Sequence, residues 1–385
     1  MSDQPSALSP GATSREPVQV GTALPADAVP DFRHLHAGHC ESGVTASMFQ
    51  NAGFPISEPM VFGVGGGVFF SHFSFVRVMG HPLTTFRSFP GNIFKNACSR
   101  LGVTYARETF RSPVTGMQRL DDLLAQGKRV GLQVNIYWLP YIPRPMRVHF
   151  NGHNLLVLEK RGVGADAIYI VSDPVMECLF QCPADALRRA RFSGTHPLLP
   201  RGLLYYPTGF AAEPDLRVAV DTGLKQVCRH MLKIPSMLPW MGVQGIAHLG
   251  REIAAWPQRH GEDKAREWLA GVVRMQEEIG TGGAGFRFIY GAFLQQAGDA
   301  LQWPELAAMA GPTTLVGDKW RVFALHASRL ARGRRGRAAP ADGAVSTTEE
   351  WAALRPLLEE IAAAERTLFS QLETVRAGRR LLGTG

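Results

Sequence analysis

The chain has 385 residues, of which 45% are hydrophobic and 19% are charged. This length exceeds what one hydrophobic core usually organises, so we expect two domains, and the composition excludes a wholly disordered chain. An excess of 41 Lys and Arg over 33 Asp and Glu gives a net charge of +8, which favours an acidic partner. Part of this excess lies in residues 331–343, which have no aromatic residue between the arginines, so we expect no nucleic-acid partner.

The N-terminus and the cysteines indicate where the protein works. Residues 1–30 are rich in Pro, Ser and Ala, so we expect a disordered or loosely packed segment. This segment lacks the basic start and the apolar stretch of a secretory signal, and no apolar run in the chain is long enough to span a bilayer. The odd, scattered set of five cysteines argues against a disulfide framework. We therefore expect a cytoplasmic protein that does not enter a membrane.

The first domain, which we place at residues 31–209, begins with a predicted helix. Val44, Met48 and Ala52 recur at four-residue spacing, and the glycine that follows is typical of a helix end. Cys40 lies at the start of this helix, where the positive end of the helix dipole stabilises a thiolate over a thiol. The sequence therefore offers Cys40 as a candidate nucleophile, although a lone cysteine is more often a buried structural residue.

Three further segments complete the expected first domain. Residues 57–70 contain four glycines but lack the third glycine of a dinucleotide-binding loop, so they predict a tight strand–turn–strand. Residues 120–141 predict a short helix followed by a strand over 130–137. Residues 153–174 predict a hairpin, because two apolar runs flank a turn that contains glycine.

The hairpin supplies a candidate base and a candidate carboxylate. His153 opens one strand and Asp173 closes its partner, and antiparallel strands bring the start of one beside the end of the other. With Cys40, these residues would form a nucleophile, a base and an orienting group. The order Cys, His, Asp, with the cysteine on a helix and the histidine on a strand, resembles that of papain-like enzymes. A plain polar pair and a turn-starting Asp are the structural alternatives.

The second domain, residues 210–385, follows a helical period. Ser346 and Glu349 form a capping box for the last predicted helix, and Pro356 within it implies a kink or a later start. The segment TGGAGF at residues 281–286 fits either an anion-binding loop or a plain loop before a helix. We therefore expect an α+β protein with a mostly helical second domain, whose helices are predicted near residues 243–256, 262–279, 286–300, 318–332 and 347–378.

A zinc site is the main alternative for the segment around Cys40. His34, His36, His39 and Cys40 carry borderline and soft ligand atoms, and zinc could use three of them with a water in the fourth position. Four candidates within seven residues rarely converge on one ion, because side chains alternate in direction along an extended segment. A metal-bound scaffold without catalytic activity therefore stays open beside the enzyme interpretation.

Several segments together match a known family. In the first domain these are HAGHCESGVTASMFQNAGFPISEPMVFGVGGGVFF, LPY, HFNGHNLLVLE and VSDP. Over these four segments the chain resembles the N-terminal domain family of butirosin biosynthesis protein H. The segments GTGGAGFRFIYGAFLQQAG and GDKWRVFALHASRL resemble the helical domain of unknown function that usually follows. The resemblance therefore extends over most of the folded chain.

The resemblance implies a papain-like cysteine acyltransferase that acts in secondary metabolism. The founding member of the family takes an acyl group from the phosphopantetheine thiol of an acyl carrier protein and places it on an amine of an aminoglycoside. Carried over by motif position, Cys40 would be the nucleophile, His153 the base and Asp173 the orienting group. No bound cofactor is expected, because the phosphopantetheine belongs to the donor protein. The product would be an amide, or a lactam where the amine lies on the acyl chain.

The resemblance defines the other site residues less sharply. Glu58 matches a family motif residue, for which acceptor-amine binding and helix capping are the alternatives. Asn135 stands where related sequences often carry Asp, which bears on acceptor recognition. The Cys40 N–H is a natural first donor to an oxyanion. His34, six residues before the nucleophile, and Gln133 are candidates for the second donor, with structural roles as the alternatives.

Two matters stay open at the level of the sequence. A thioesterase or a peptidase would use the same triad with water in place of the amine. The helices of the second domain would either cover one side of the acyl pocket or pair two chains as a dimer. An acidic carrier protein fits the net positive charge, and candidate contacts for it are Arg87, Lys95, Arg100, Arg188, Arg189 and Arg191.

Overall fold

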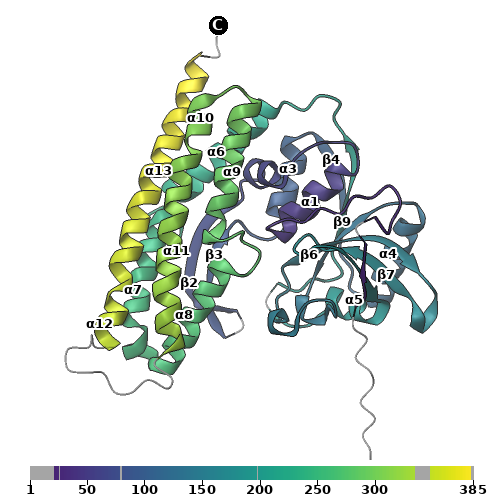
Figure 1. Ribbon diagram of the computed structural model, residues 1–385, viewed down its shortest axis with the longest axis horizontal. Coiled ribbons are helices and arrows are strands. Elements are labelled where there is room, and N and C mark those ends of the chain that lie inside the picture. Colours follow the sequence, from purple (N-terminus) through teal and green to yellow (C-terminus); the bar gives the residue numbers. More distant parts are fainter. Residues whose placement is uncertain (1–20, 26, 79, 197, 334–346, 383–385) are drawn as a thin grey trace, which may run out of the picture.

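The chain forms two lobes, one built around a sheet and the other from long helices (Figure 1). This computed structural model describes residues 21–25, 27–78, 80–196, 198–333 and 347–382. Most of the segment expected to be disordered, the basic loop beyond residue 333 and the capping residue Ser346 lie outside the described residues. The α+β prediction is confirmed, with an antiparallel sheet in the first part of the chain and helices in the last part.

The sheet lobe contains seven antiparallel strands. Their order across the sheet is β1-β8-β7-β6-β5-β9-β4, so the predicted hairpin β6–β7 lies near the centre. The strand bounds are β1 Ala23–Leu24, β4 Val103–Glu108, β5 Val130–Val134, β6 His153–Arg161, β7 Ile168–Ser172, β8 Leu179–Pro183 and β9 Leu204–Phe210. The predicted strand over 130–137 ends earlier than expected, because a short 3-10 helix, Ile136–Trp138, follows Asn135.

Strand β6 is buried on both faces, which explains its unbroken apolar run. Leu156 and Leu158 belong to the core that lies against helix α1, whereas Leu155 and Val157 belong to a second core under the opposite face. Alternate residues of a strand point to opposite faces, so a central strand covered on both sides needs no polar positions. Helix α1, Cys40–Gln50, packs on one face, and helices α4, Pro113–Ala125, and α5, Ala184–Arg191, pack on the other.

The prediction of a strand–turn–strand over residues 57–70 is wrong. Helix α2, Glu58–Val64, occupies the first half of this segment, and strand β2, Val68–Val78, begins after the glycines. Ser57 caps the helix by accepting a hydrogen bond from the Met60 N–H, a local signal that outweighs the glycines that follow. Gly63 is required by packing, since a Cβ there would lie 2.0 Å from the ring of Phe293 on helix α9.

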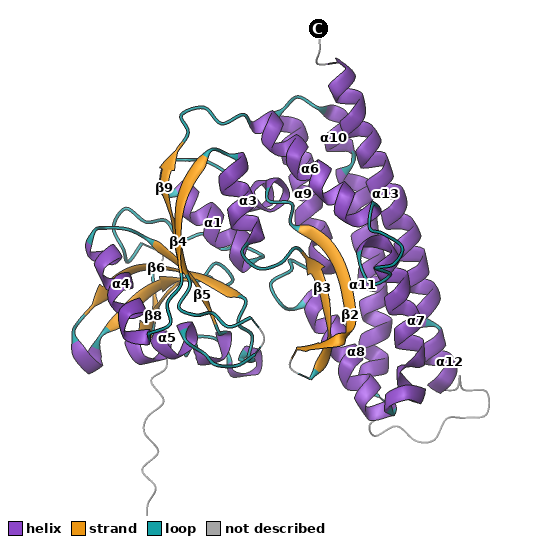
Figure 2. Cartoon of the chain, turned by 180° about the vertical axis from the view of Figure 1, so that it is seen from behind, coloured by secondary structure: helices purple, strands orange, loops and turns teal. Residues whose placement is uncertain are grey.

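A long hairpin from the first part of the chain reaches into the helical lobe. Strand β2 pairs with β3, His81–Arg87, in a separate two-stranded sheet (Figure 2). The hairpin packs on helix α7, Gly242–His260, and on helix α8, Glu262–Glu277. One hydrophobic core runs from α1 and α3, Asn92–Arg100, through this hairpin to the last helix. The two lobes are therefore joined by a continuous core.

The helical lobe confirms the predicted helices and adds others. Helix α6 was not predicted, and α11 begins earlier than the predicted 318. The chain breaks between α12 and α13, just before Pro356, which confirms the later start that this proline implied. No described helix combines the length and the apolar character needed to cross a bilayer. The remaining helices are α6 Leu216–Leu232, α9 Arg287–Ala300, α10 Pro304–Ala308, α11 Ala310–Arg332, α12 Thr347–Ala352 and α13 Leu354–Leu382.

Candidate active site

Cys40 is the first residue of α1, and the residues before it are held by a half-buried carboxylate. The Glu58 side chain accepts hydrogen bonds from the Gly38 N–H at 2.9 Å and the His39 N–H at 2.7 Å. It also accepts one from Ser42 Oγ at 3.1 Å. Glu58 thus fixes the path of the chain into the helix. The N–H of Cys40 belongs to the first turn of α1, where a helix offers no internal acceptor.

The first turn of α1 is tied to neighbouring elements by Glu41. Its side chain is almost fully buried, and it forms an ion pair with Arg87 at the end of β3. The same carboxylate accepts hydrogen bonds from the Gly91 N–H at 3.0 Å and the Phe94 N–H at 3.1 Å, at the start of α3. Through these contacts the buried carboxylate anchors α1, the helix that carries Cys40, to the end of β3 and to the start of α3.

His39, the N-cap of α1, is a neutral link between Arg87 and Glu58. Burial, together with the charges of Arg87 and His153, lowers the pKa of His39 well below 6.5. Nδ1 of the ring accepts a hydrogen bond from the Ser42 N–H at 3.3 Å and lies 2.9 Å from Ser42 Oγ, while Nε2 lies against the Arg87 guanidinium. Ser42 in turn donates to Glu58. The network orients the turn that carries the nucleophile.

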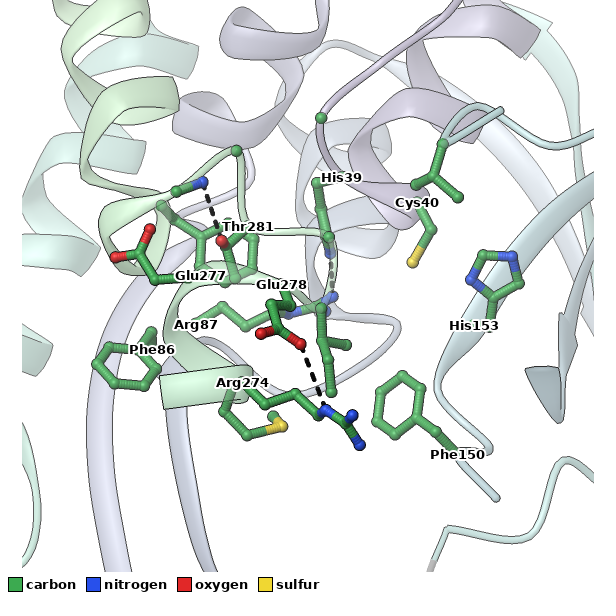
Figure 3. A pocket seen from close by; sticks show the side chains of 18 of the residues that line it. His39, Cys40, Phe86, Arg87, Phe150, His153, Arg274, Glu277, Glu278 and Thr281 are labelled. Carbon is green, nitrogen blue, oxygen red and sulfur yellow. Dashed lines mark hydrogen bonds and ion pairs between the residues drawn. The ribbon is translucent and has the colours of Figure 1, made fainter. Parts of the chain in front are cut away.

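The structure brings Cys40, His153 and Asp173 together. The side chains of Cys40 and His153 lie beside each other at the same side of the cavity (Figure 3), and Cys40 interacts with the imidazole of His153. The other side of the ring is held by Asp173, since His153 Nε2 lies 2.6 Å from Asp173 Oδ2. Burial alone would lower the pKa of His153, but Asp173 and Cys40 outweigh it and raise the pKa to about 10. A protonated His153 at neutral pH is therefore favoured by both of its neighbours.

The Asp173 carboxylate is itself fixed by two hydrogen bonds besides its contact with His153. The Tyr141 hydroxyl donates to Oδ2 at 3.0 Å, and the Val175 N–H donates to Oδ1 at 3.3 Å. His34 steadies the same loop, because its ring nitrogens lie 2.8 Å from Ser172 Oγ and 2.8 Å from the Met176 carbonyl. His34 therefore supports the carboxylate side of the site. The structure does not bring it to the sulfur, where an oxyanion donor would lie.

Asn154 is a residue of the site that the sequence did not reveal. Its amide donates to Cys40 Sγ at 3.8 Å and to the Gly152 carbonyl at 3.1 Å. Tyr205 on β9 donates to the other side of this amide at 2.8 Å, which fixes its orientation. A fixed N–H group beside the sulfur is the kind of donor that an oxyanion needs. Its position directly after His153 is the only sequence signal that could have identified it.

A cavity of about 530 Å³ opens in front of Cys40 and is lined by both lobes. From the sheet lobe come His39, Cys40, Phe150 and His153. The opposite wall is the loop over residues 279–283 with the end of α8, and it includes Glu277 and Glu278 (Figure 3).

The glycine-rich loop of the helical lobe approaches the nucleophile closely. Gly280 has a φ of +56°, and a Cβ on it would lie 3.9 Å from the Cys40 nitrogen. The helical lobe therefore completes the site. Of the two alternatives for its helices, covering the cavity is the one that the structure supports.

Comparison with known families assigns both parts of the chain. Residues 39–174 match the family described as Butirosin biosynthesis protein H, N-terminal. Residues 185–372 match a domain of unknown function (DUF4872). Residues 39–174 therefore form a domain of the butirosin biosynthesis protein H N-terminal family. This domain implies a role in butirosin-type biosynthesis and suggests an enzyme of antibiotic biosynthesis. No curated protein matches the chain.

The two family matches do not divide the protein at the boundary between its lobes. The butirosin H domain, as we call residues 39–174, contains Cys40, His153 and Asp173. The second match begins in α5 and includes β9, a strand of the sheet lobe that carries Tyr205. It also includes the loop over residues 279–283. Both families therefore contribute residues to one site.

The remaining predicted residues of the butirosin H domain lie outside the cavity. Gln133 donates to the Asn151 carbonyl at 2.9 Å, in the turn that leads into β6. Asn135 is fully buried, and its amide donates to Asn151 Oδ1 at 2.7 Å and to Ser193 Oγ at 3.0 Å. Both side chains hold the loop before His153. The structure therefore gives them a positioning role rather than contact with the cavity.

The zinc alternative finds no support in the arrangement of its ligands. His34 faces the loop of Asp173, whereas His39 faces Arg87, so the clustered side chains diverge. Within the described parts of the chain, no three or more His, Cys, Asp or Glu side chains are grouped to hold a metal ion. Three other cysteines lie buried in the hydrophobic cores of the fold. Burial raises the pKa of Cys182 and of Cys228 to about 12. Burial also raises the pKa of Cys98.

The TGGAGF loop already has an anionic partner from the chain itself. The Glu277 carboxylate accepts the Ala284 N–H through both of its oxygens at 3.2 Å. It thereby occupies the position that a phosphate would take at the start of the 3-10 turn that precedes α9. Two of the residues predicted to contact a carrier protein already have partners within the chain. Arg87 pairs with Glu41, and Arg191 is fully buried and donates to two carbonyl groups. Arg188 and Arg189 remain exposed beside Asp185.

Proposed function

We propose that this protein is a papain-like cysteine acyltransferase that forms an amide through an acyl-cysteine intermediate. The observation that carries the proposal is the pairing of Cys40 at the start of a helix with an imidazole whose far nitrogen is held by Asp173 at 2.6 Å. A nucleophile, a base and an orienting carboxylate in this relation define cysteine-dependent acyl transfer chemistry. The family supports a place in antibiotic biosynthesis.

The first half-reaction loads the enzyme. The Cys40 thiolate attacks the carbonyl carbon of a carrier-protein thioester, and a new C–S bond forms as the carbonyl oxygen becomes an oxyanion. The Cys40 N–H and the Asn154 amide are the donors best situated to stabilise that oxyanion. The bond to the pantetheine sulfur then breaks, and His153 returns a proton to the departing thiolate.

The second half-reaction transfers the acyl group to an amine. The neutral His153 accepts the proton of the attacking nitrogen, a C–N bond forms, and the Cys40 thiolate leaves. No cofactor is needed, because a thioester is already activated and the amide is the more stable product. The opposite wall carries charges of both signs, the carboxylates Glu277 and Glu278 and the guanidinium groups of Arg274 and Arg321, which suits a polar acceptor. An amine on the acyl chain itself would give a lactam.

An acidic acyl carrier protein is the donor that fits the charge of this chain. The net charge of +8 would speed the encounter of the two proteins and make it sensitive to salt. Arg188 and Arg189 on α5 are exposed candidates for that contact. Hydrolysis of the acyl-enzyme, as in a thioesterase, is the competing function, because water could take the place of the amine.

Intact-mass spectrometry tests the proposal directly. The protein is mixed with an acyl N-acetylcysteamine thioester, which mimics the end of phosphopantetheine, with and without an added amine. We expect one acyl group on the wild-type chain and on Cys178→Ala, a control cysteine outside the cavity, but none on Cys40→Ala. Amide must then form in proportion to added amine. Free acid released at the same rate with and without amine would identify a hydrolase instead.

A further inference from the structure

A second cavity of about 720 Å³ lies next to the one that contains Cys40. One wall is the β2–β3 hairpin, with Phe73, Phe75 and Leu83, and the other is α8, with Ala270 and Gly271. Its volume falls within the range of about 300–1,000 Å³ that small-molecule sites usually have. The acyl transfer steps described above do not use this space.

The two cavities share part of their walls. Phe150, Met275 and Ile279 line both of them, as do Arg274 and Glu278, which form an ion pair with 3.4 Å between Nε and Oε2. Phe150 and Arg274 are visible at the lower edge of the first cavity (Figure 3). A chain attached to Cys40 would have to pass Phe150 and Met275 to enter the second cavity. Met275 has a flexible side chain that adapts to such a passage.

The chemistry of the second cavity suits a hydrocarbon. Most of its lining consists of Phe, Val, Leu, Pro, Ala and Met side chains. Several of its polar groups already have partners: Thr84 Oγ1 lies 2.9 Å from His72 Nδ1 behind the wall, His81 Nε2 lies 3.8 Å from Glu267, and Arg274 pairs with Glu278. A sugar buried there would leave its hydroxyl groups without partners, which is costly. A methylene chain has no such groups to satisfy.

The rim of this cavity carries large apolar side chains that face solvent. Phe75 is 66% exposed, Phe89 is 51% exposed and Leu198 is 51% exposed, and all three line the cavity. Phe75 also contacts Trp240, with 5.5 Å between ring centroids. Exposed apolar side chains that gather around a concavity usually mark a binding site. The rim therefore extends the apolar surface of the cavity outward.

We propose that the second cavity binds the hydrocarbon part of the acyl group, so that the donor is a thioester of a medium-length aliphatic or aromatic acid. The attachment of that group to Cys40 rests on the function proposed above, whereas the affinity of the cavity for the chain does not. The two cavities would then bind different reactants. The acyl chain lies along α8, and the amine approaches from the side of Glu277.

Binding measured without catalysis tests this inference. Octanoyl and acetyl N-acetylcysteamine are titrated calorimetrically into Cys40→Ala, which cannot be acylated at that position. Each buried methylene contributes up to roughly a fourfold gain in affinity, so octanoyl should bind at least about tenfold more tightly than acetyl. Adding Ala270→Phe, which fills the cavity from an exposed helix position, should remove this preference. The matched change Ala363→Phe, on an exposed position of α13, should not.

The outcomes distinguish the binding role of the second cavity from the transfer reaction at Cys40. Equal affinities for the two thioesters, or equal effects of Ala270→Phe and Ala363→Phe, would overturn the assignment of the cavity even if Cys40 is acylated. A preference for octanoyl that Ala270→Phe abolishes supports it. If that preference is found but wild-type protein is never acylated, the cavity assignment stands and the proposed transfer reaction fails.

Discussion

Replacing Asp173 by Asn should destabilise the protein strongly at neutral pH and only weakly at high pH. In the folded protein the pKa of His153 is raised from 6.5 to about 10. The folded state therefore holds a proton that the unfolded chain releases at neutral pH. The resulting stability is complete below about pH 6.5 and is lost as the pH rises through about 10. Asp173→Asn removes the carboxylate that raises this pKa.

The magnitude follows from the same values. At about 1.4 kcal/mol per pH unit, the interval between 6.5 and about 10 corresponds to at most about 5 kcal/mol. Loss of one partner of a buried ion pair typically costs about 3–5 kcal/mol, which agrees with this limit. Once His153 is neutral, the single Asn oxygen can still accept from either Tyr141 or Val175, which donate to different oxygens of Asp173, so one of these two bonds is lost. The remaining cost at high pH should be about 1 kcal/mol.

Urea unfolding, followed by circular dichroism near pH 7 and near pH 10.5, measures this difference. Tyr141→Phe is the matched control, because it removes a neutral donor from the same carboxylate oxygen. Burial and the nearby Asp173 raise the pKa of Tyr141 well above 10, so its hydroxyl keeps its proton across the range. The control should cost about 1 kcal/mol near pH 7 and less near pH 10.5, where Tyr141 ionises in the unfolded chain but not in the folded protein. An equal destabilisation by Asp173→Asn at both pH values would refute the charged pair with His153.

Three other substitutions follow from the same contacts. Glu58→Gln weakens the charge-assisted bond to the His39 N–H, so we expect a loss of about 1.5–3 kcal/mol by urea unfolding and slower acylation in a mass-spectrometric time course. Glu365→Gln breaks the fully buried ion pair with Arg287, which should cost about 3–5 kcal/mol in the same unfolding assay. Gly280→Ala forces a positive φ on alanine, at about 1–2 kcal/mol, and should slow acylation by crowding the nucleophile's N–H.

Controls for these substitutions are present in the chain. Glu373→Gln removes a surface pair with Lys233 and should cost no more than about 1 kcal/mol, in contrast to the buried pair. Gly311→Ala lies in open space within α11 and should leave acylation unchanged. If Glu365→Gln proves as mild as Glu373→Gln, the helical lobe does not depend on its buried charges. If Gly280→Ala is acylated at the wild-type rate, a side chain at residue 280 does not obstruct the Cys40 N–H.

The sequence predicted those parts of the site that depend on local patterns. The period of Val44 and Met48 placed Cys40 at a helix start, and the alternation of strand and turn placed His153 next to Asp173. These inferences need only neighbours in sequence and the geometry of a hairpin. The resemblance to a family then connected the two segments, which periodicity alone could not do.

The parts that were missed depend on contacts between distant segments. Glu41 meets Arg87 across 46 residues, and nothing in the local sequence of either one indicates a partner. Asn154 was not identified as a site residue, because Tyr205 from β9, which orients its amide, is distant in the sequence. Helix α2 was missed for a different reason, since four glycines outweighed the cap that Ser57 provides. His34 showed the right spacing for an oxyanion donor but lies against Ser172 instead.

The β2–β3 hairpin has a consequence for how such proteins can be rebuilt. It is part of the butirosin H domain but packs on helices α7 and α8 of the other lobe, and its last residue, Arg87, pairs with Glu41 on the helix of the nucleophile. A chimaera that joins this N-terminal half to the helical half of a relative would have to match both the hairpin groove and the loop opposite Cys40. Swapping halves at a single junction is therefore expected to yield inactive hybrids unless the two surfaces are exchanged as a unit.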